Sequence, residues 1–379
     1  MNVVVIGAGV AGLGIAWKLA SAGASVTVLE RAQVGNGATT ASAGMIAATA
    51  ELGEAETPEA AFARRGSALW PAFAQELEQQ SGVDIAFRRN GSLLVTMNGE
   101  EPSAHPPTER HGQGADVESL TAAEARAREP MLSENIAGAL WAPHEATVDS
   151  QALCRALAVA FVRAGGKVLS NETVVRFERD ESRVLGVVTP FHTHRADAYV
   201  LAAGAWTSRV EGLPAGAIPP VVPVKGEILV LAPPEGAAPP AHVVWGNGIY
   251  LTPRSNRLLV GATVERAGFD TAVSQAALSW LRRQANGLMP ALENWRIVEH
   301  WAGLRPGSPD GLPILGETSV EGLYVASGQY RNGILFAPAI AEVLSRLVLE
   351  RTGGVSAFDP RRGIRPDSAL SILETPHRV

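Results

Sequence analysis

The sequence predicts a two-domain protein of the mixed α/β class, in which an α/β domain with a parallel sheet carries an inserted antiparallel, β-rich domain. A strand, a glycine turn, a helix and a second strand follow one another from almost the first residue. Strand-like runs and helical patterns then alternate through the second half of the chain. The 379 residues suffice for two or three domains. With 46% apolar and 18% charged residues, the chain can bury a large core and is not disordered.

The first unit of the α/β domain is the most clearly marked. Val3 to Ile6 is a run of β-branched side chains that closes on Gly7, which is typical of a buried parallel strand. A helical pattern follows from Val10 to about Ser21 and ends near Gly23. The stretch from Ser25 to Glu30 predicts a second strand, so the chain opens with a βαβ unit.

The later elements are predicted from periodicity and from glycine and proline positions. A long helix is expected over about 59–80, a polar loop near 99–114, and a helix capped by Asp149-Ser150 that runs to Arg163. The other expected strands are Thr173–Phe177, Val184–Thr189, Tyr199–Ala202, Glu227–Leu231, Tyr250–Thr252, Leu258–Gly261 and Leu323–Ala326, and the other expected helices are Ser274–Asn286 and Ile334–Leu349. We assign residues 1–85, 149–215 and 300–365 to the first domain, and 86–148 and 216–299 to a second, substrate-binding domain.

Gly7-Ala8-Gly9-Val10-Ala11-Gly12 matches the dinucleotide fingerprint and has the required context between a strand and a helix. Gly7 permits the tight turn, Gly9 lets the backbone approach a pyrophosphate, and Gly12 allows close packing of helix and strand. The helix N-terminus adds free N–H groups for the phosphates. Glu30 ends the second strand, where an acidic side chain accepts hydrogen bonds from a ribose diol. Such a carboxylate disfavours the 2′-phosphate of NADP despite Arg31. Because the fingerprint lies between a strand and a helix, we expect the first domain to be Rossmann-like.

Three further glycine sites favour FAD over NAD. Small residues from Thr39 to Met45 would let the backbone pass close to a ring system. Gly204 follows an expected strand, and Gly328 precedes Asn332-Gly333 and an apolar helix whose N-terminus would face negative charge on a flavin. Each site alone could be a simple turn, and only their combination indicates FAD.

The chain resembles the glycine oxidase branch of the D-amino-acid oxidase family of flavoproteins. The matching stretches occur in family order over nearly the whole chain. Besides the fingerprint they are Ala38–Met45, Pro223–Glu227, Tyr250–Arg254, Trp301–Gly307 and Arg331–Pro338.

The resemblance implies an FAD-dependent oxidation of glycine or a related small amino or N-alkylamino acid, such as sarcosine or a D-amino acid. The products would be the keto acid and, with O2 as acceptor, H2O2. Arg305 matches the carboxylate-binding arginine, Tyr250 a tyrosine that adds a second contact, and Arg331 lies in the stretch lining flavin and substrate. Arg305 could instead form a surface salt bridge, Tyr250 could be a half-buried strand aromatic, and Arg331 could hold a loop carbonyl or the flavin.

The expected FAD-binding residues come from the segments that the resemblance assigns to the cofactor. They are Gly7, Gly9, Val10, Ala11, Gly12, Glu30, Arg31, Ala38, Thr39, Ala43, Gly44, Met45, Val174, Gly204, Gln329, Tyr330, Arg331, Asn332, Gly333, Ile334 and Leu335. We expect the FAD to be noncovalent, because the sole cysteine, Cys154, lies in a helix pattern and is better placed in the core. No histidine spacing indicates a metal site.

Composition and the resemblance also bear on partners. A net charge of −6 argues against nucleic-acid binding, and no export or membrane signal is evident, so a cytoplasmic location is expected. The family implies a homo-oligomer and a role in thiamine biosynthesis. Two alternatives remain open: a D-amino-acid dehydrogenase that passes electrons to a quinone or another carrier, and a flavin-binding module without turnover.

The sequence departs from glycine oxidases at three positions. Gln329 stands where a histidine is usual, Gly248 where a polar or imidazole side chain is familiar, and Val264 where a methionine often lines the pocket. The smaller side chains predict a pocket that admits a larger substrate.

Overall fold

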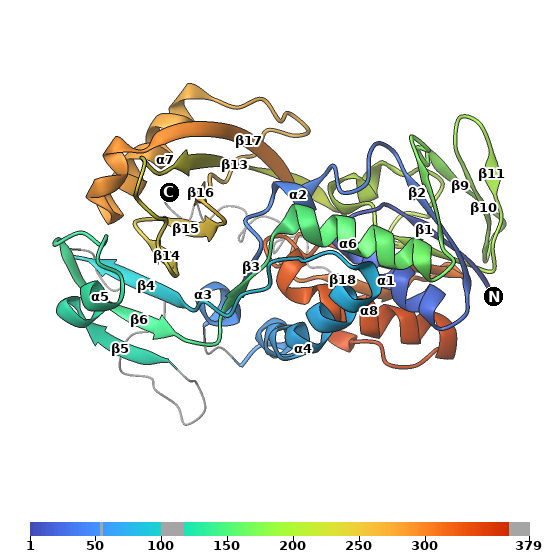
Figure 1. Cartoon of the computed structure of the whole chain (residues 1–379). Coiled ribbons are helices and arrows are strands. Elements are labelled where there is room, and N and C mark those ends of the chain that lie inside the picture. Colours follow the sequence, from blue (N-terminus) through green and yellow to red (C-terminus); the bar gives the residue numbers. More distant parts are fainter. Residues whose placement is uncertain (54–55, 100–116, 364–379) are drawn as a thin grey trace.

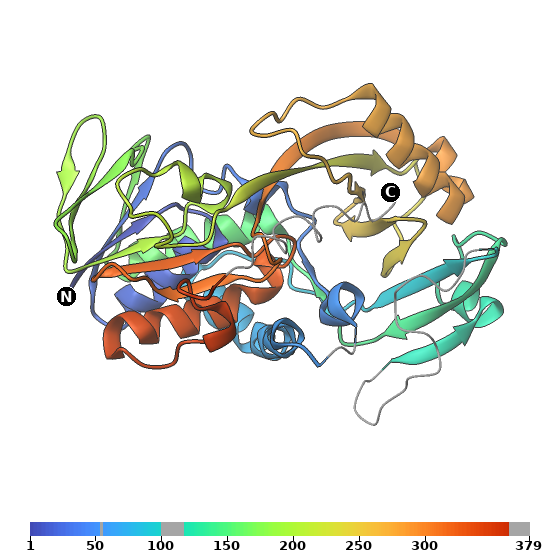
Figure 2. The ribbon, with the colours of Figure 1, turned by 180° about the vertical axis from the view of Figure 1, so that it is seen from behind.

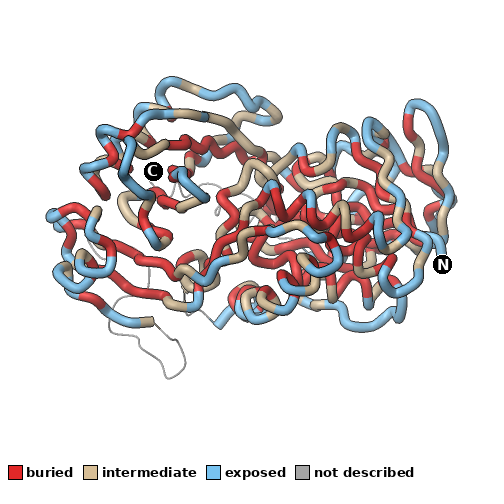
Figure 3. The backbone as a smooth tube through the Cα atoms, viewed as in Figure 1, coloured by how far each residue is buried: buried red, intermediate tan, exposed pale blue. Residues whose placement is uncertain are grey.

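The computed structural model describes residues 1–53, 56–99 and 117–363, which form two halves, each with its own sheet (Figure 1). Apart from its first residue, the polar loop expected near 99–114 lies outside the described residues, as do residues 364 and 365 of the expected first domain. Buried segments are concentrated along both sheets and along the helices packed on the first sheet (Figure 3). The predicted two-domain α/β fold is confirmed.

The first half is built on a six-stranded sheet in which every neighbouring pair except the last is parallel. In spatial order its strands are β8 (Lys167–Ser170), β2 (Ser25–Glu30), β1 (Asn2–Ile6), β12 (Ala198–Leu201), β19 (Leu323–Ser327) and β18 (Ile314–Glu317). β1 and β2 are consecutive in the sequence and linked by one helix, whereas β12 and β19 come from far along the chain. Three separated segments therefore share this sheet.

The two faces of this sheet are covered differently because successive strand residues point to opposite sides. Val3 and Val5 of β1 face a core formed with four helices, which are α1 (Val10–Ser21), α4 (Pro58–Ser81), α6 (Ser150–Arg163) and α8 (Gly333–Glu350). Val4 and Ile6 face a small antiparallel sheet of β9 (Arg176–Arg179), β10 (Val184–Val188) and β11 (Thr193–His194).

The second half is an eight-stranded, mostly antiparallel sheet. In spatial order its strands are β17 (Arg296–Gly307), β13 (Val222–Ala232), β16 (Arg257–Gly261), β15 (Ile249–Arg254), β14 (Val243–Gly246), β4 (Ser92–Met97), β6 (Ile136–Ala142) and β5 (Glu118–Thr121). The long strands β13 and β17 arch from this sheet toward the first half (Figures 1 and 2). Residue 300, the expected start of the last first-domain segment, lies inside β17, and the domain division stays a prediction.

One face of this sheet packs against α7 (Gln275–Leu288) and α5 (Ala122–Arg128). The other face carries Ile228 and Tyr250 and meets Ala43, Ala47 and Ala50 of the first half. The remaining elements are short: α2 (Ala38–Ala41), α3 (Ala48–Leu52), β3 (Met45–Ile46), β7 (Ala146–Thr147), and the 3-10 turns η1 (Gly204–Arg209), η2 (Pro290–Asn294) and η3 (Ser356–Phe358). No helix among the described residues is long and apolar enough to cross a membrane.

The elements agree with prediction best where local signals are strong. The bounds of β2 and α6 match at both ends, and Asp149 caps α6 by accepting hydrogen bonds from two backbone N–H groups. The strand expected over Thr173–Phe177 is instead β9 at Arg176–Arg179. Just before β9, Glu172 donates its backbone N–H to the Glu30 backbone carbonyl at the end of β2, and Val174 lines a cavity.

Candidate active site

A cavity of about 450 Å³ lies between the carboxyl ends of the parallel strands and the inner face of the antiparallel sheet. The end of a parallel strand is where α/β proteins usually bind ligands. Every residue predicted to bind cofactor or substrate lines this cavity, except Gly12. Segments separated by more than 300 residues in the sequence, such as Gly7 and Gln329, meet here.

The glycine turn after β1 has the geometry of the fingerprint. Gly7 has φ +107, and a Cβ there would lie 2.5 Å from the carbonyl oxygen of Ala202, so only glycine fits. A Cβ at Gly12 would overlap the carbonyl oxygen of Gly7. Gly12 thus acts in packing α1 against β1, as predicted, rather than in lining the cavity. The Thr39 hydroxyl accepts a hydrogen bond from the Val10 backbone N–H at 3.0 Å, which ties α2 to the start of α1.

Glu30 lies at the end of the cavity formed by the glycine turn and binds the backbone there. Its carboxylate accepts hydrogen bonds from the backbone N–H groups of Ala8 at 2.8 Å and Ala32 at 3.0 Å. The adjacent Arg31 guanidinium lies 3.6 Å from the centre of the Trp206 ring, a cation–π contact that the sequence did not indicate. These contacts fix the carboxylate at the edge of the fingerprint turn.

The opposite end of the cavity is formed by the N-terminus of α8. No side chain caps this helix, and Gly333, Ile334 and Leu335 of its first turn line the cavity. Free N–H groups and the positive end of the helix dipole therefore face the open space. The amide nitrogen of the neighbouring Gln329 side chain is buried and has no acceptor among the described residues.

Arg305 reaches the cavity from β17 without a carboxylate partner. Its Nη1 donates to the backbone carbonyls of Lys225 at 3.3 Å and Thr263 at 3.1 Å. Within the described ranges no acidic side chain forms an ion pair with it, and Nε and Nη2 have no acceptor. Burial lowers the pKa of Arg305, but a guanidinium stays charged at neutral pH. An unbalanced cation with free donors in a cavity is suited to bind a carboxylate.

Arg331 has a different environment because Glu51 neutralises it. Its Nε lies 3.1 Å from the Glu51 carboxylate, and this contact raises the pKa of Arg331. Glu51 belongs to α3, lines the cavity and was missed in the sequence, where no motif surrounds it. Only the fold brings α3 and the start of α8 together.

Tyr250 projects from β15 into the same cavity. Gly261 is the cross-strand neighbour of Tyr250 on β16. A Cβ at Gly261 would overlap the phenol ring, so the glycine makes room for the tyrosine. Trp245 packs edge-to-face against it, with ring centres 5.4 Å apart. Burial raises the pKa of Tyr250, with Arg305 and Arg331 opposing that shift, so the hydroxyl stays neutral at physiological pH.

The expected enlargement of the pocket is not supported by the residues on which it was based. Gly248 is exposed in the turn between β14 and β15, and Val264 is 38% exposed on the loop after β16. Neither lines the cavity. Gln329, the third departure, does line it.

The residues present fit an FAD molecule extended through the cavity. The glycine turn and α1 offer a phosphate cradle, Glu30 lies beside it, and the helix terminus of α8 and the unpaired Gln329 amide face the other end. At the α8 end the Gln329 amide nitrogen has no acceptor among the described residues, and the small residues 41–44 also line the cavity.

Comparison with known proteins agrees with this assignment. Residues 2–347 match the DAO family, described as FAD dependent oxidoreductase. A glycine oxidase of Geobacillus kaustophilus is 36% identical over 367 residues, which cover 94% of each protein. The bifunctional protein ThiO/ThiG of Nostoc sp. is 35% identical over 98% of this chain but only 56% of its own length.

Solved structures show the same similarity. The crystal structure of the glycine oxidase from Geobacillus kaustophilus has a TM-score of 0.89 at 36% identity, covering 96% of this chain and 99% of that one. An iminodiacetate oxidase from Chelativorans sp. BNC1 has a TM-score of 0.84 at 27% identity, with coverage of 94% and 98%. The chain belongs to the DAO family of FAD-dependent oxidoreductases.

Proposed function

We propose that this protein is an FAD-dependent oxidase of glycine or a related small amino or N-alkylamino acid, with O2 as electron acceptor. The observation that carries the proposal is the unpaired Arg305 guanidinium in the cavity that also contains the dinucleotide fingerprint. The glycine oxidase that is 36% identical and the iminodiacetate oxidase act, by name, on substrates of this class.

The chain would hold FAD at both ends of the cavity. The backbone around Gly7, Gly9 and α1 would bind the pyrophosphate, Glu30 the ribose, and the N-terminus of α8 the flavin. When bound, FAD supplies an acceptor for a hydride. We propose noncovalent binding, because Cys154 is buried in α6 and its thiol has a pKa raised by burial to about 12, which leaves it a neutral, unreactive group.

The protein's contribution to the reaction is to orient the substrate. Arg305 would bind the carboxylate through its free N–H donors, and the Tyr250 hydroxyl would add a second contact. With the carboxylate fixed, the Cα–H bond of a small amino acid points in one direction. If the amine is bound in its neutral form, its nitrogen lone pair would form a C=N bond as the C–H bond breaks, with the hydride passing to bound FAD. Water then hydrolyses the imine to the keto acid and ammonia or an amine.

Arg331 is the weaker candidate for the carboxylate. Because Glu51 already balances its charge, binding there would require the carboxylate to compete with a permanent ion pair. We propose that Arg331 lines the flavin and substrate site in this paired form.

A peroxide assay over glycine, sarcosine, iminodiacetate and D-amino acids tests the proposal. Substrate-dependent H2O2 supports the oxidase. Flavin reduction by substrate without peroxide, but with quinone reduction, would identify a dehydrogenase. If no amine reduces the flavin, the protein would be a flavin-binding module without turnover. Such a module does not need an arginine that binds a substrate carboxylate.

We also propose a cytoplasmic homo-oligomer with a role in thiamine biosynthesis, as the resemblance implies. Light scattering after gel filtration would measure the oligomeric state, and a mass equal to that of one chain would contradict this part of the proposal.

A further inference from the structure

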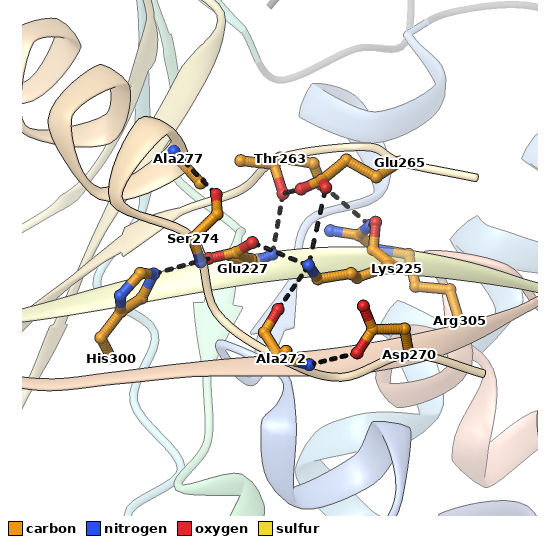
Figure 4. Close-up of polar contacts among 10 residues, drawn as sticks. All are labelled: Lys225, Glu227, Thr263, Glu265, Asp270, Ala272, Ser274, Ala277, His300 and Arg305. Atoms are coloured by element: carbon orange, nitrogen blue, oxygen red, sulfur yellow. Dashed lines mark hydrogen bonds and ion pairs between the residues drawn. The ribbon is translucent and has the colours of Figure 1, made fainter. Parts of the chain in front are cut away.

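A cluster of charged side chains centred on the buried Lys225 and Glu227 lies on β13, which pairs with the strand β17 that carries Arg305 (Figure 4). The Lys225 ammonium, on a side chain only 4% exposed, is 2.9 Å from the carboxylate of Glu227, which is fully buried. Lys225 also donates to the backbone carbonyl of Ala272 at 2.6 Å. This cluster does not line the cavity and has no part in the function proposed above.

Glu227 connects three elements through its second oxygen. That oxygen lies 2.8 Å from His300 Nε2 on β17 and accepts the backbone N–H of Ser274 at 3.0 Å. Ser274 is the N-cap of α7, and its hydroxyl accepts from the Ala277 N–H. The carboxylate thereby joins β13, β17 and the start of α7.

The same cluster fixes the segment after β16 against β13. The backbones of Lys225 and Glu265 exchange two hydrogen bonds of 2.9 Å. The Thr263 hydroxyl accepts from the Glu227 backbone N–H at 3.0 Å and donates to Glu265 at 2.7 Å, and Glu265 lies 3.6 Å from the Lys225 ammonium. Thr263 and Lys225 are thus held to each other by backbone, hydroxyl and charge.

Lys225 and Thr263 also supply the two carbonyl groups that hold Arg305. Neighbouring residues of a strand point to opposite faces, so the Lys225 and Glu227 side chains leave β13 away from Gly226, where the guanidinium lies. Since no carboxylate within the described residues anchors Arg305, the placement of its free donors depends on these carbonyls.

We propose that Glu227 is a positioning residue for substrate recognition, acting through Lys225 and Thr263 on the Arg305 guanidinium. This inference rests on the proposed role of Arg305. A buried ion pair contributes little net stability compared with apolar packing, and its better-supported use is to impose one arrangement on the groups around it. Here the arrangement imposed is that of two carbonyl groups that accept hydrogen bonds from one nitrogen, Nη1, of the substrate-binding cation.

The test is a titration of the FAD-bound Glu227→Gln protein with glycolate, a small carboxylate that is not an amine. Binding is followed by the change in flavin absorbance. Glutamine keeps an oxygen acceptor for Ser274 but removes the carboxylate charge that Lys225 and His300 contact. Because small displacements of binding groups cost up to about a hundredfold, we expect the Kd to rise about tenfold, with FAD retained.

A double-mutant comparison separates positioning from general destabilisation. In the Arg305→Ala background, adding Glu227→Gln should leave the residual glycolate affinity unchanged. Val187→Ala removes buried side-chain atoms from the remote β10, so it should lower Tm without changing the Kd. If Glu227→Gln lowers Tm but changes the Kd less than twofold, the inference is wrong.

Two further outcomes keep the inference and the proposed function distinguishable. If Arg305→Ala itself leaves glycolate affinity intact, the proposed anchor fails and the inference fails with it. If only Glu227→Gln is without effect, the anchor stands and the positioning role is rejected. If Glu227→Gln does not fold, Thr263→Val is used in its place. This variant leaves the ion pairs of Lys225 but removes the hydroxyl that links the Glu227 N–H to Glu265. An unchanged glycolate Kd in Thr263→Val would overturn the inference.

Discussion

At the scale of single residues, Arg305 and Arg331 line the same cavity in opposite electrostatic situations. Glu51 balances Arg331, whereas among the described residues Arg305 has only backbone carbonyls as partners. A carboxylate substrate therefore gains most from Arg305, because that pairing neutralises a charge the protein leaves unbalanced. The role of Arg305 could be predicted from the sequence by resemblance, but the reason for preferring it to Arg331 could not. Glu51 lies 280 positions from Arg331 and in no motif.

We predict that Arg305→Ala raises the KM for the amino-acid substrate by two or more orders of magnitude. Removing one partner of a buried charge pair costs about 3–5 kcal/mol, and tenfold in affinity corresponds to about 1.4 kcal/mol. Steady-state kinetics on the FAD-bound variant measure this, with FAD content as the control. A change below tenfold would transfer the anchor role to Arg331.

We predict that Glu30→Ala weakens FAD binding by about 1.5–3 kcal/mol, the value of a hydrogen bond to a charged group. The carboxylate holds the Ala8 N–H within the fingerprint turn, so its loss affects the turn as well as any ribose contact. Fluorescence titration of the apoprotein with FAD gives the Kd. Glu76→Ala, which breaks an ion pair with Lys18 away from the cavity, is the control. Equal Kd values for Glu30→Ala and wild type would remove Glu30 from the site.

At the scale of elements, the strand pair β13–β17 presents Arg305 to the cavity through two glycines. Gly226 and Gly303 face each other in the register, and a Cβ at Gly226 would overlap the Arg305 guanidinium. β17 was not predicted as a strand, because charged and polar residues at 299 and 300 and glycines at 303 and 307 interrupt its apolar pattern. Long-range pairing with β13, rather than local propensity, stabilises it.

We predict that Gly226→Ala raises the substrate KM more than tenfold with a small change in Tm. The guanidinium is the end of a flexible side chain, so it can move aside at low cost in stability, but it then leaves its carbonyl partners. Gly307→Ala is the control on the paired strand, since its Cβ would meet the Val224 side chain at 3.1 Å and Gly307 does not line the cavity. Kinetics and thermal unfolding of both variants distinguish the two effects, and an unchanged KM in Gly226→Ala would contradict the placement of Arg305.

A second element-scale feature is the carboxyl group that anchors α3. Glu145, 4% exposed, accepts the Ala50 N–H at 2.7 Å, and its other oxygen has no hydrogen-bond donor among the described residues. Burial raises the pKa of Glu145 from 4.5 to about 7. The folded state then binds the proton more tightly than the unfolded state. The stability contributed by protonated Glu145 is present below about pH 4.5 and is lost as the pH rises to about 7.

We therefore predict that Glu145→Gln is more stable than wild type at pH 8, by up to about 3 kcal/mol, and equal to it near pH 4.5. Glutamine keeps the acceptor for Ala50 and cannot ionise. Urea unfolding of the FAD-bound proteins at several pH values measures the difference. Glu59, whose pKa burial also raises to about 7, retains its own pH dependence in both proteins. A constant difference from pH 4.5 to 8 would show that Glu145 ionises normally.

At the scale of the whole molecule, the active site exists only because the two halves meet. The fingerprint turn belongs to the parallel sheet, Tyr250 and Arg305 to the antiparallel sheet, and Gln329 to the loop before α8. The dinucleotide half could be predicted from local motifs. The dimensions of the substrate side could not, because Gly248 and Val264, which were expected to enlarge it, lie outside the cavity lining. Which side chains face a shared cavity depends on strand register over hundreds of residues.

The choice of electron acceptor depends on the space and charge around the bound flavin, and both halves of the molecule contribute residues to that cavity. No residue type encodes reactivity with O2, so the oxidase assignment follows from family membership and the glycine oxidase relatives. We predict that the flavin, reduced anaerobically by glycine or sarcosine, reoxidises in air-saturated buffer much faster than free reduced flavin and yields one H2O2 per flavin. Stopped-flow absorbance with a peroxide assay measures both. Arg305→Ala, reduced with dithionite instead of substrate, is the control, and its reoxidation should remain fast because O2 needs no carboxylate anchor. Reoxidation no faster than that of free flavin, together with rapid reduction of a quinone, would show that the protein is a dehydrogenase.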